Sequence, residues 1–232
     1  MRLDLEDMEQ RPSNLIEGFG DRLEKMLPSL FTHRCSKGEP GGFFARVKEG
    51  TWMGHIIEHI ALEIQTIAGM DTGFGRTRMT KTDGIYNVVF SYTEEKAGIY
   101  AAEASVRIAE ALIDDQPYDL EFDIQRLREL RQMERLGPST GSIVDEAIAR
   151  DIPWIRLNKS SLIQLGYGKN QVRFRATMTE RTNSIAVDIA GNKDETKRML
   201  KDSAIPVAKG VTISEIEDLD NAIKTVGFPL VF

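Results

Sequence analysis

The sequence predicts an α/β protein of the α+β kind, in which helices and strands pack as layers around a hydrophobic core. Amphipathic helical stretches and short runs of β-branched and aromatic residues follow one another with short connections. The composition is that of an ordinary folded protein, with 41% hydrophobic and 28% charged residues in 232. A chain of this length can bury a core as one large domain or two smaller ones.

The first part of the chain is predicted to be a mixed domain of sheet and helix. The clearest strand-like run, IYNVVFSY, is rich in β-branched and aromatic residues and follows the turn signal Asp83-Gly84. The predicted strands are Arg2–Leu5, Gly42–Val47 and Ile85–Tyr92. Between and after them, apolar residues recur at helical spacing. The predicted helices are Asn14–Leu27, Thr51–Ala68, Glu94–Ile113, Asp123–Leu136 and Ser139–Arg150.

The pattern changes near Ile152, beyond which short strands become more frequent. The predicted strands of this part are Trp154–Leu157, Val172–Met178, Ile185–Asp188, Val207–Val211 and Pro229–Phe232. The predicted helices are Lys193–Asp202 and Ser214–Val226. We therefore expect two domains, residues 1–152 and residues 153–232.

Charge and cysteine content exclude several classes of protein. A formal net charge of -6 argues against a nucleic-acid-binding protein, which usually carries a basic excess. The single cysteine, Cys35, excludes an intrachain disulfide and favours a reducing compartment. No apolar run approaches the ~20 residues that span a bilayer, and the first residues lack the apolar segment of a signal peptide. We expect a cytoplasmic protein with no nucleic-acid or membrane partner.

The helix predicted over Thr51–Ala68 carries two of the three histidines of the chain, His55 and His59. On a helical wheel of about 100° per residue, the isoleucines fill one broad side and the histidines lie opposite, with Glu58 at the edge of their side. Thr51 is the expected N-cap. The histidines are therefore predicted to face a cleft or solvent rather than the core.

The order His-x-x-Glu-His in this helix is typical of a metal site. Two imidazoles four residues apart project from one face and can reach the same ion. Glu58 lies beside the pair and is free to act as a general base on water. This order is the reverse of H-E-x-x-H and marks inverted zincin peptidases, so Zn²⁺ is the expected metal. The alternative is two solvated histidines paired with nearby acids.

A catalytic zinc site needs a third protein ligand and keeps its fourth position for water. The helix predicted over Glu94–Ile113 is the expected donor, because it is long and alanine-rich and can approach closely. Its predicted apolar stripe runs through Ile99 and Val106, with Glu103 beside it. In inverted zincins the third ligand is a glutamate on a later helix, with a second acid one to two turns before it. We therefore expect Glu103 as a metal ligand and Glu95 as a catalytic residue; alternatively, these acids merely favour the helix N-terminus or solvent.

Gly73-Phe74-Gly75-Arg76-Thr77-Arg78 is predicted to be a glycine-broken loop that carries two arginines. Backbone donors and guanidinium groups both bind carboxylates and phosphates. Arg76 and Arg78 are therefore the candidate substrate-binding residues. The alternative is a surface turn without a ligand.

Several longer runs of the sequence carry a family resemblance. In the first part these are RPSN at residues 11–14, CSKG at 35–38, GGF at 41–43 and EGTWMGHIIEHIALEIQ at 49–65. In the second part they are SLIQLGYG at 161–168, SIAVDIA at 184–190 and GFPLV at 227–231. The first set resembles the N-terminal domain of the cyanophycin synthetase family, and the second set resembles the beginning of its ATP-grasp domain. The resemblance extends over essentially the whole chain.

The resemblance implies a substrate and cofactors. The family uses ATP and Mg²⁺ to build cyanophycin, a branched polymer of aspartate and arginine. An ATP-grasp domain adds aspartate and a Mur-ligase-like domain adds arginine. The N-terminal domain is implied to bind and position the polymer, and in some members to trim it into primers with zinc through an H-x-x-E-H motif. The expected partners are the polymer and either further copies of this chain or the remainder of the synthetase.

The chain departs from the family pattern in its nucleotide sites. In the family, the strand that begins GFPLV continues into a nucleotide-contacting lysine, whereas Phe232 follows here. No GxxxxGK[ST] loop occurs in the sequence. We therefore expect a fragment, with residues 153–232 as a truncated start of the ATP-grasp domain. No ATP-binding residue is expected in this chain, and no ligation by it alone.

Three functional hypotheses stay open at this point. The chain is part of a cyanophycin synthetase and carries the polymer-handling domain. Alternatively, the first domain is a zinc-dependent hydrolase that cuts cyanophycin into primers. The third hypothesis is a non-catalytic polymer-binding scaffold in which the histidine motif is a relic. The first hypothesis is compatible with either of the others.

Overall fold

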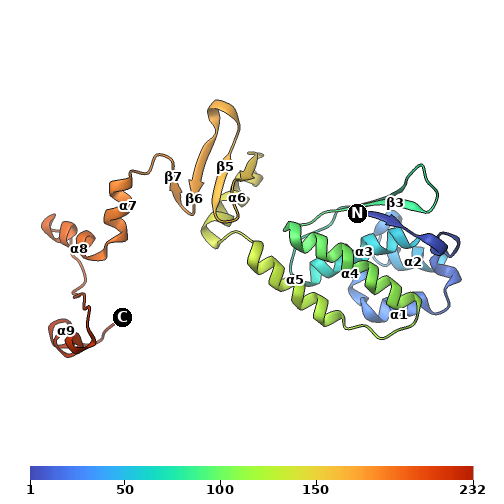
Figure 1. The fold of residues 1–232 in the computed structure, drawn as a ribbon, viewed down its shortest axis with the longest axis horizontal. Coiled ribbons are helices and arrows are strands. Elements are labelled where there is room, and N and C mark those ends of the chain that lie inside the picture. The colour runs from blue at the N-terminus through green and yellow to red at the C-terminus, as the bar shows by residue number, and fades with distance from the viewer. Residues whose placement is uncertain (232) are drawn as a thin grey trace. The chain divides into compact units, whose positions relative to one another are not determined.

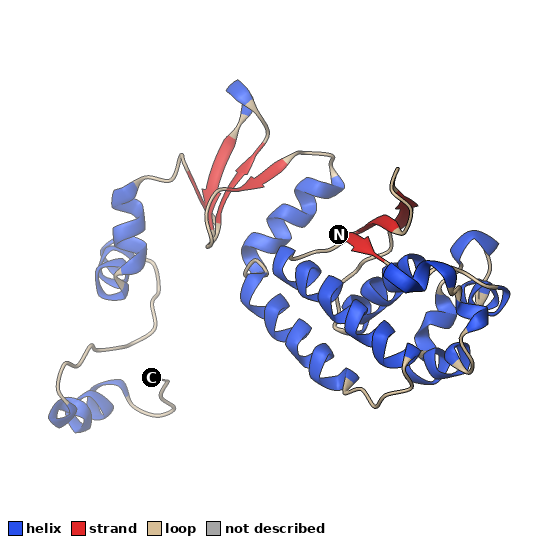
Figure 2. Ribbon diagram, turned by 45° about the vertical axis from the view of Figure 1, so that its right-hand side comes forward, coloured by secondary structure: helices blue, strands red, loops and turns tan. Residues whose placement is uncertain are grey.

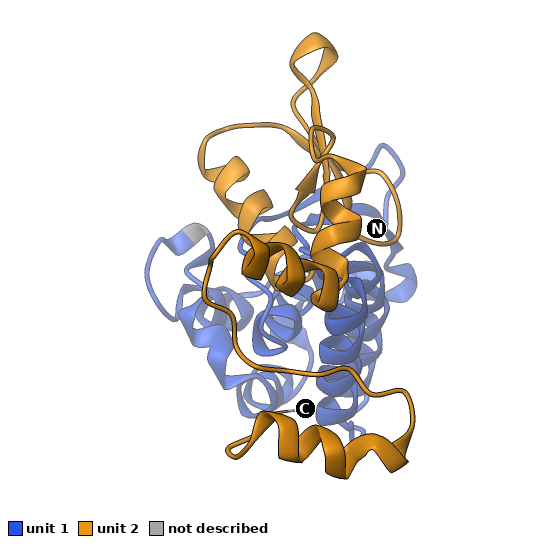
Figure 3. Cartoon of the chain, turned by 90° about the vertical axis from the view of Figure 1, so that its left-hand side faces the viewer, with its two compact units in different colours: residues 1–136 blue, residues 137–232 orange. Residues whose placement is uncertain are grey.

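The computed structural model describes residues 1–231, with the side chain of Ser36 left out. The chain forms two compact units, Met1–Leu136 and Gly137–Phe232 (Figure 3). The second unit begins before the helix α6 (Pro138–Ala149), whereas the sequence led us to expect a boundary after it. Helix α6 is hydrogen-bonded to the segment that follows it: the Ile152 N–H donates to the Ala147 carbonyl at 2.8 Å. Within the described residues, no helix combines the length and apolar character needed to cross a membrane.

Unit 1 packs helices against a small antiparallel sheet (Figures 1 and 2). Its helices are α1 (Phe19–Met26), α2 (Gly42–Glu49), α3 (Met53–Ile67), α4 (Glu95–Ile113) and α5 (Leu120–Glu134). Its sheet has the order β1-β3-β2, with β1 (Arg2–Asp4), β2 (Gly75–Met79) and β3 (Ile85–Phe90). The predicted α+β class is confirmed, and the strand pairing is antiparallel in both units.

Helix α3 is the central element of unit 1, because it packs against α4, α5, β2 and β3. Its apolar side is fully buried at Ile56, Ile60 and Ile64. On α4, the buried side includes Ala97, Ala101, Ala104 and Ile108. Small side chains at this contact let the two helix backbones approach closely. The packing leaves the polar side of α3 facing β2 and the segment before α2.

Helix α2 corrects the strand predicted over Gly42–Val47. Phe43 and Val47 are one helical turn apart and both are buried in the core of unit 1. The helix begins after Gly41, at φ 80°, and ends before Gly50, at φ 110°. Both φ values favour glycine, so they mark the two ends of the helix. The aromatic residues that suggested a strand instead form the buried side of this helix.

Strand β2 corrects the loop predicted over residues 73–78. Gly75–Met79 pairs antiparallel with β3, with Thr77 opposite Val88. The strand lies at the edge of its sheet, and the Thr77 hydroxyl donates to the Gly54 carbonyl of α3 at 3.1 Å. The predicted N-cap at Thr51 is also wrong, because α3 begins at Met53 after Trp52. Thr51 contacts His55 instead.

Unit 2 contains α6 and a second antiparallel sheet of order β4-β5-β6-β7. Its strands are β4 (Trp154–Arg156), β5 (Leu162–Leu165), β6 (Val172–Arg175) and β7 (Met178–Thr179). Its further helices are α7 (Ser184–Gly191), α8 (Lys193–Asp202) and α9 (Leu219–Val226). The prediction over Lys193–Asp202 is confirmed.

Three strand predictions in unit 2 are wrong for the described residues. Ile185–Asp188 lies within α7, where the Asn183 side chain accepts a hydrogen bond from the Ile185 N–H and caps the helix. Val207–Val211 forms no strand, and neither do residues 229–231. Phe232, on which the last predicted strand and the departure from the family also rested, lies outside the described residues. The identity of this unit as the start of an ATP-grasp domain stays a prediction.

Candidate metal centre

A polar pocket of about 990 Å³ lies between the polar side of α3, strand β2 and two 3₁₀ turns, Pro28–Thr32 and Cys35–Lys37. The structure brings most of the predicted site residues together here. Those that line it are His55, Glu58, His59, Arg76 and Arg78. The histidines therefore face a cleft, as the helical wheel predicted. His33, Cys35 and Glu63 also line the pocket, although the sequence did not single them out as site residues.

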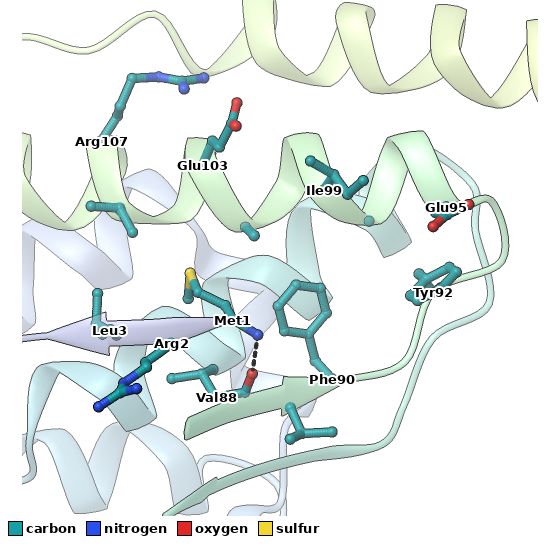
Figure 4. Close-up of a pocket in the computed structure, with 14 residues that line it drawn as sticks. Met1, Arg2, Leu3, Val88, Phe90, Tyr92, Glu95, Ile99, Glu103 and Arg107 are labelled. Carbon is teal, nitrogen blue, oxygen red and sulfur yellow. Dashed lines mark hydrogen bonds between the residues drawn. The ribbon is translucent and has the colours of Figure 1, made fainter. Parts of the chain in front are cut away.

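Glu95 and Glu103 lie elsewhere. Both are exposed and line a second, mainly apolar pocket of about 880 Å³ formed by α4, β1 and β3 (Figure 4). The structure does not bring these carboxylates to the histidines. The reason is the orientation of α4, which buries its alanine side rather than the stripe through Ile99. The Ile99 side chain is 55% exposed and lines the second pocket beside Glu95 and Glu103.

Cys35, His55 and His59 converge on one point of the polar pocket. One ligand atom from each, a sulfur and two ring nitrogens, lies within 4.8 Å of the others. Cys35 Sγ is 3.2 Å from His55 Nε2. Thiolate and imidazole are the ligands that tetrahedral Zn²⁺ prefers in proteins. The donor set therefore fits a zinc ion, with Cys35 at the position for which the sequence suggested Glu103.

Residues 31–43 fold back on themselves and carry Cys35 and His33 to α3. The Gly41 N–H donates to the Phe31 carbonyl at 2.6 Å, and the Phe43 N–H donates to the His33 carbonyl at 3.2 Å. A β-carbon on Gly42 would lie 2.4 Å from the Arg34 carbonyl oxygen, so this close approach requires glycine. The GG pair before Phe43 is the sequence signal for this turn.

His59 is surrounded by other rings, one of which is hydrogen-bonded to a carboxylate. Its Nδ1 lies 2.8 Å from His33 Nδ1, and His33 Nε2 lies 2.7 Å from Glu63 Oε2. Phe43 stacks on the His59 ring, with centroids 4.2 Å apart and planes inclined by 25°. The His55 ring stands edge-on to His59 at a centroid distance of 4.7 Å. These contacts hold the His59 ring in one orientation.

Both candidate ligand histidines are neutral near pH 7. Burial lowers the pKa of His55 to about 4, and the positive charge of Arg46 adds to the effect. Burial lowers the pKa of His59 to about 2, with further contributions from His55 and His33. Neutral imidazole is the form that binds a metal ion.

Glu58 is buried beside the histidines. Its Oε2 accepts a hydrogen bond from the Thr77 hydroxyl at 2.6 Å. Burial raises the pKa of this carboxyl, and the Thr77 hydrogen bond opposes the rise. A carboxylate with a raised pKa is a stronger base than an exposed one and suits proton transfer near neutral pH.

The pocket wall is rich in arginine. Arg34, Arg46, Arg76 and Arg78 all line it. Arg76 and Arg78 lie on the edge strand β2, and both are exposed. Because guanidinium groups bind carboxylates through paired hydrogen bonds, this wall suits an anionic ligand.

Comparison with known proteins confirms the resemblance to cyanophycin synthetases. Residues 1–114 match the family described as cyanophycin synthase-like N-terminal domain. The whole chain is 52% identical to a cyanophycin synthetase of Synechocystis sp. and 50% identical to one of Crocosphaera subtropica, and it spans 27% of the length of each. It is also 52% identical to a cyanophycin synthetase of Trichormus variabilis, of which it spans 26%.

Proposed function

We propose that this chain is the polymer-handling part of a cyanophycin synthetase, because residues 1–114 match the family described as cyanophycin synthase-like N-terminal domain. We further propose that its polar pocket is a zinc-dependent hydrolase centre that cleaves the aspartate–arginine polymer. One observation supports the second step above all others. The ligand atoms of Cys35, His55 and His59 converge beside the buried carboxylate of Glu58.

In this proposal Cys35, His55 and His59 hold the zinc ion. A zinc ion bound there supplies Lewis-acid chemistry, which activates water at neutral pH and polarises a carbonyl group. Glu58 takes a proton from the attacking water and later delivers it to the leaving nitrogen. One water is consumed, the carbon–nitrogen bond breaks, and a carboxyl group and an amine are formed. Glu95 and Glu103 have no part in this step because they line the other pocket.

The substrate is proposed to bind along β2. Among the described strands, β2 pairs only with β3, so its other edge offers backbone groups to an extended chain. Arg76 and Arg78 on this strand bind carboxylates of the polymer. This arrangement leads an extended anionic polymer past Glu58.

Ligation is assigned to other parts of the longer family members. The ATP and Mg²⁺ that the family uses to join aspartate and arginine are not needed for the proposed hydrolysis. We assign no ATP-binding residue in this chain and propose residues 153–232 as the beginning of the ATP-grasp domain.

The test is to purify the chain without a histidine tag, measure its zinc content, and follow the length of cyanophycin chains over time. The hydrolase proposal expects bound zinc, polymer shortening, and loss of shortening in Glu58→Gln with zinc retained. Glu103→Gln is the matched control and should cleave at the parent rate. A parent chain that binds the polymer but neither binds zinc nor shortens it would leave the scaffold function and exclude the hydrolase.

A further inference from the structure

Strand β1 forms an outer edge of the sheet of unit 1. Among the described strands it pairs only with β3, so the other edge of its backbone has no strand beside it. We propose that this edge is a self-association surface, on which β1 of a second copy of the chain pairs antiparallel with Leu3 opposite Leu3. The surface lies outside the polar pocket, so the proposal does not rest on the proposed function.

The hydrogen-bond pattern of β1 determines which backbone groups the open edge offers. Met1 and Val88 exchange both of their backbone hydrogen bonds, at 2.8 and 2.9 Å. Bonded and non-bonded pairs alternate along an antiparallel ladder, so the N–H and carbonyl of Leu3 also point toward β3. The backbone groups of Arg2 and Asp4 therefore point to the open edge. Each of these two residues offers one donor and one acceptor to an added strand.

These groups fit a second copy of β1 in one register. With Leu3 opposite Leu3 on a twofold axis, Arg2 of each copy lies opposite Asp4 of the other, and the two residues exchange backbone hydrogen bonds. Their side chains then meet on one face of the joined sheet as a pair of opposite charge, which stabilises a cross-strand contact. An axis through Arg2 or through Asp4 would place like charges directly opposite. The charges of β1 thus select the register centred on Leu3.

An apolar groove beside β1 belongs to the same surface. It is the second pocket described above, lined by β1, β3 and α4 (Figure 4). Met1, Tyr92 and Ile99 in its wall are exposed. Leu3 lies on the side of β1 that faces α4, because it stands opposite the buried Tyr86 of β3. A second β1 alongside would bring its own Leu3 to this side and cover part of the groove.

The charge of this surface favours a second copy over a uniformly charged ligand. Glu95 and Glu103 line the groove together with Arg2 and Arg107, and Asp4 is exposed at the strand edge. A surface of mixed charge is complementary to a partner that is itself mixed, as β1 is. By contrast, the edge of β2 proposed for the polymer carries two arginines.

The test begins with sedimentation equilibrium of the whole chain over a range of concentrations, for which we expect a reversible dimer. Arg2→Asp places two carboxylates opposite each other in both pairs, and Asp4→Arg places two guanidinium groups there. Each substitution should weaken self-association about tenfold. Asp7→Arg should dimerise like the parent and is the matched control, because Asp7 is exposed in the 3₁₀ turn that follows β1.

Three results of this experiment would overturn the proposal. The first is a parent chain that is monomeric at every concentration. The second is parent-like dimerisation of either charge variant, because the interface would then lie elsewhere. The third is a monomeric parent chain that binds cyanophycin and loses this binding in Arg2→Asp, which would assign the edge to the polymer.

Mixing the two charge variants tests the register. One variant carries carboxylates at both positions 2 and 4 and the other carries guanidinium groups at both, so a mixed pair restores opposite charges in both contacts. An equimolar mixture should form heterodimers with about the affinity of the parent, identified by native mass spectrometry with one variant labelled with ¹⁵N. Asp4→Arg also loses the hydrogen bond that Asp4 Oδ1 accepts from the Glu6 N–H at 3.0 Å, so circular dichroism checks its folding. Folded variants that form no heterodimer would overturn the proposal.

Disulfide trapping provides a second readout of the register. Directly opposite residues of a non-hydrogen-bonded antiparallel pair have Cα atoms about 4.5 Å apart, within the range of a disulfide. Leu3→Cys should therefore form a covalent dimer on mild oxidation, whereas Arg2→Cys would face Asp4 and should not. The parent chain, whose single cysteine is Cys35, is the control. Equal cross-linking of the two variants would overturn the register centred on Leu3.

Discussion

Gly75 of β2 lies so close to Glu58 of α3 that a β-carbon on the glycine would stand 2.4 Å from Glu58 Oε1. The missing side chain therefore makes the space in which the carboxylate sits. Thr77, two residues further along the same side of β2, donates to Glu58 Oε2. Strand β2 thus provides the space for the side chain of the proposed base, Glu58, and also fixes its orientation.

Gly75→Ala should displace the Glu58 carboxylate and leave the fold intact. A shift of about 1 Å in a catalytic group can lower a rate about 100-fold, so we expect a loss of that order in polymer cleavage. The measurement is the initial rate of chain shortening beside a thermal unfolding curve. Gly73→Ala is the control, because Gly73 lines the same pocket and a β-carbon there would have nothing within 4 Å. Equal rates in the two variants would contradict the role of Gly75.

Thr77→Val should shift the acid limb of the pH–rate profile to higher pH. The Thr77 hydrogen bond lowers the pKa of Glu58 against the larger effect of burial, so removing it lets the pKa rise further. A base with a higher pKa stays protonated to a higher pH and is inactive over that range. Rates measured from pH 5 to 9 test this. Thr66→Val is the control, because Thr66 lines the same pocket but donates to the Leu62 carbonyl rather than to Glu58. An acid limb unchanged from the parent would exclude Thr77 as the group that tunes Glu58.

Cys35→Ser and Glu103→Gln together decide the third ligand. The sulfur of Cys35 lies within 4.8 Å of a ring nitrogen of His55 and of one of His59, whereas Glu103 lines the apolar pocket. We expect zinc content to fall strongly in Cys35→Ser and to match the parent in Glu103→Gln, as measured by metal analysis after dialysis against a weak chelator. The reverse pattern would restore the ligand set suggested by the sequence.

The zinc-free protein should lose stability as the pH falls from about 6.5 to 4. In this range the imidazoles of the unfolded chain bind protons, while the lowered pKa values of His55 and His59 keep the folded forms neutral. The unfolded state therefore binds more protons, and the free energy of unfolding decreases with falling pH. Denaturant unfolding at several pH values measures this slope. His55→Gln should flatten it, and an unchanged slope would show that His55 does not titrate on unfolding.

Asp123→Asn should destabilise unit 1 by about 1.5–3 kcal/mol, the range for hydrogen bonds to a charged group. Asp123 of α5 is buried and accepts hydrogen bonds from Tyr100 at 2.6 Å, from Arg107 at 3.0 Å and from Tyr118. The substitution leaves the Arg107 charge without its partner. Chemical denaturation followed by circular dichroism gives the free energy, and Asp114→Asn at an exposed position is the control. A difference within about 0.5 kcal/mol would mean that the network adds little to stability.

Many residues of the polar pocket could be predicted, because the sequence pattern that indicates them is local. The 3.6-residue period of α3 places His55 and His59 on one side of a helix, and that holds wherever the helix packs. The helical period also located α4 and α5 within a few residues, and the run of β-branched and aromatic residues located β3. The H-x-x-E-H order then indicated a metal and a base without any knowledge of tertiary contacts.

Only the tertiary structure decided which distant residues meet α3. Cys35 and His33 reach the pocket because residues 31–43 fold back across Gly42, and Glu103 does not because α4 buries Ala97, Ala101 and Ala104 rather than Ile99. Local periodicity cannot choose between two weakly apolar sides of a helix. That choice depends on how closely the helix backbones can approach, which is a property of the packed core. The sequence therefore determined the helix, the side of it that carries His55 and His59, and Glu58 beside them. The approach of Cys35 and the contacts that join Glu63, His33 and His59 were decided by packing between segments far apart in the chain.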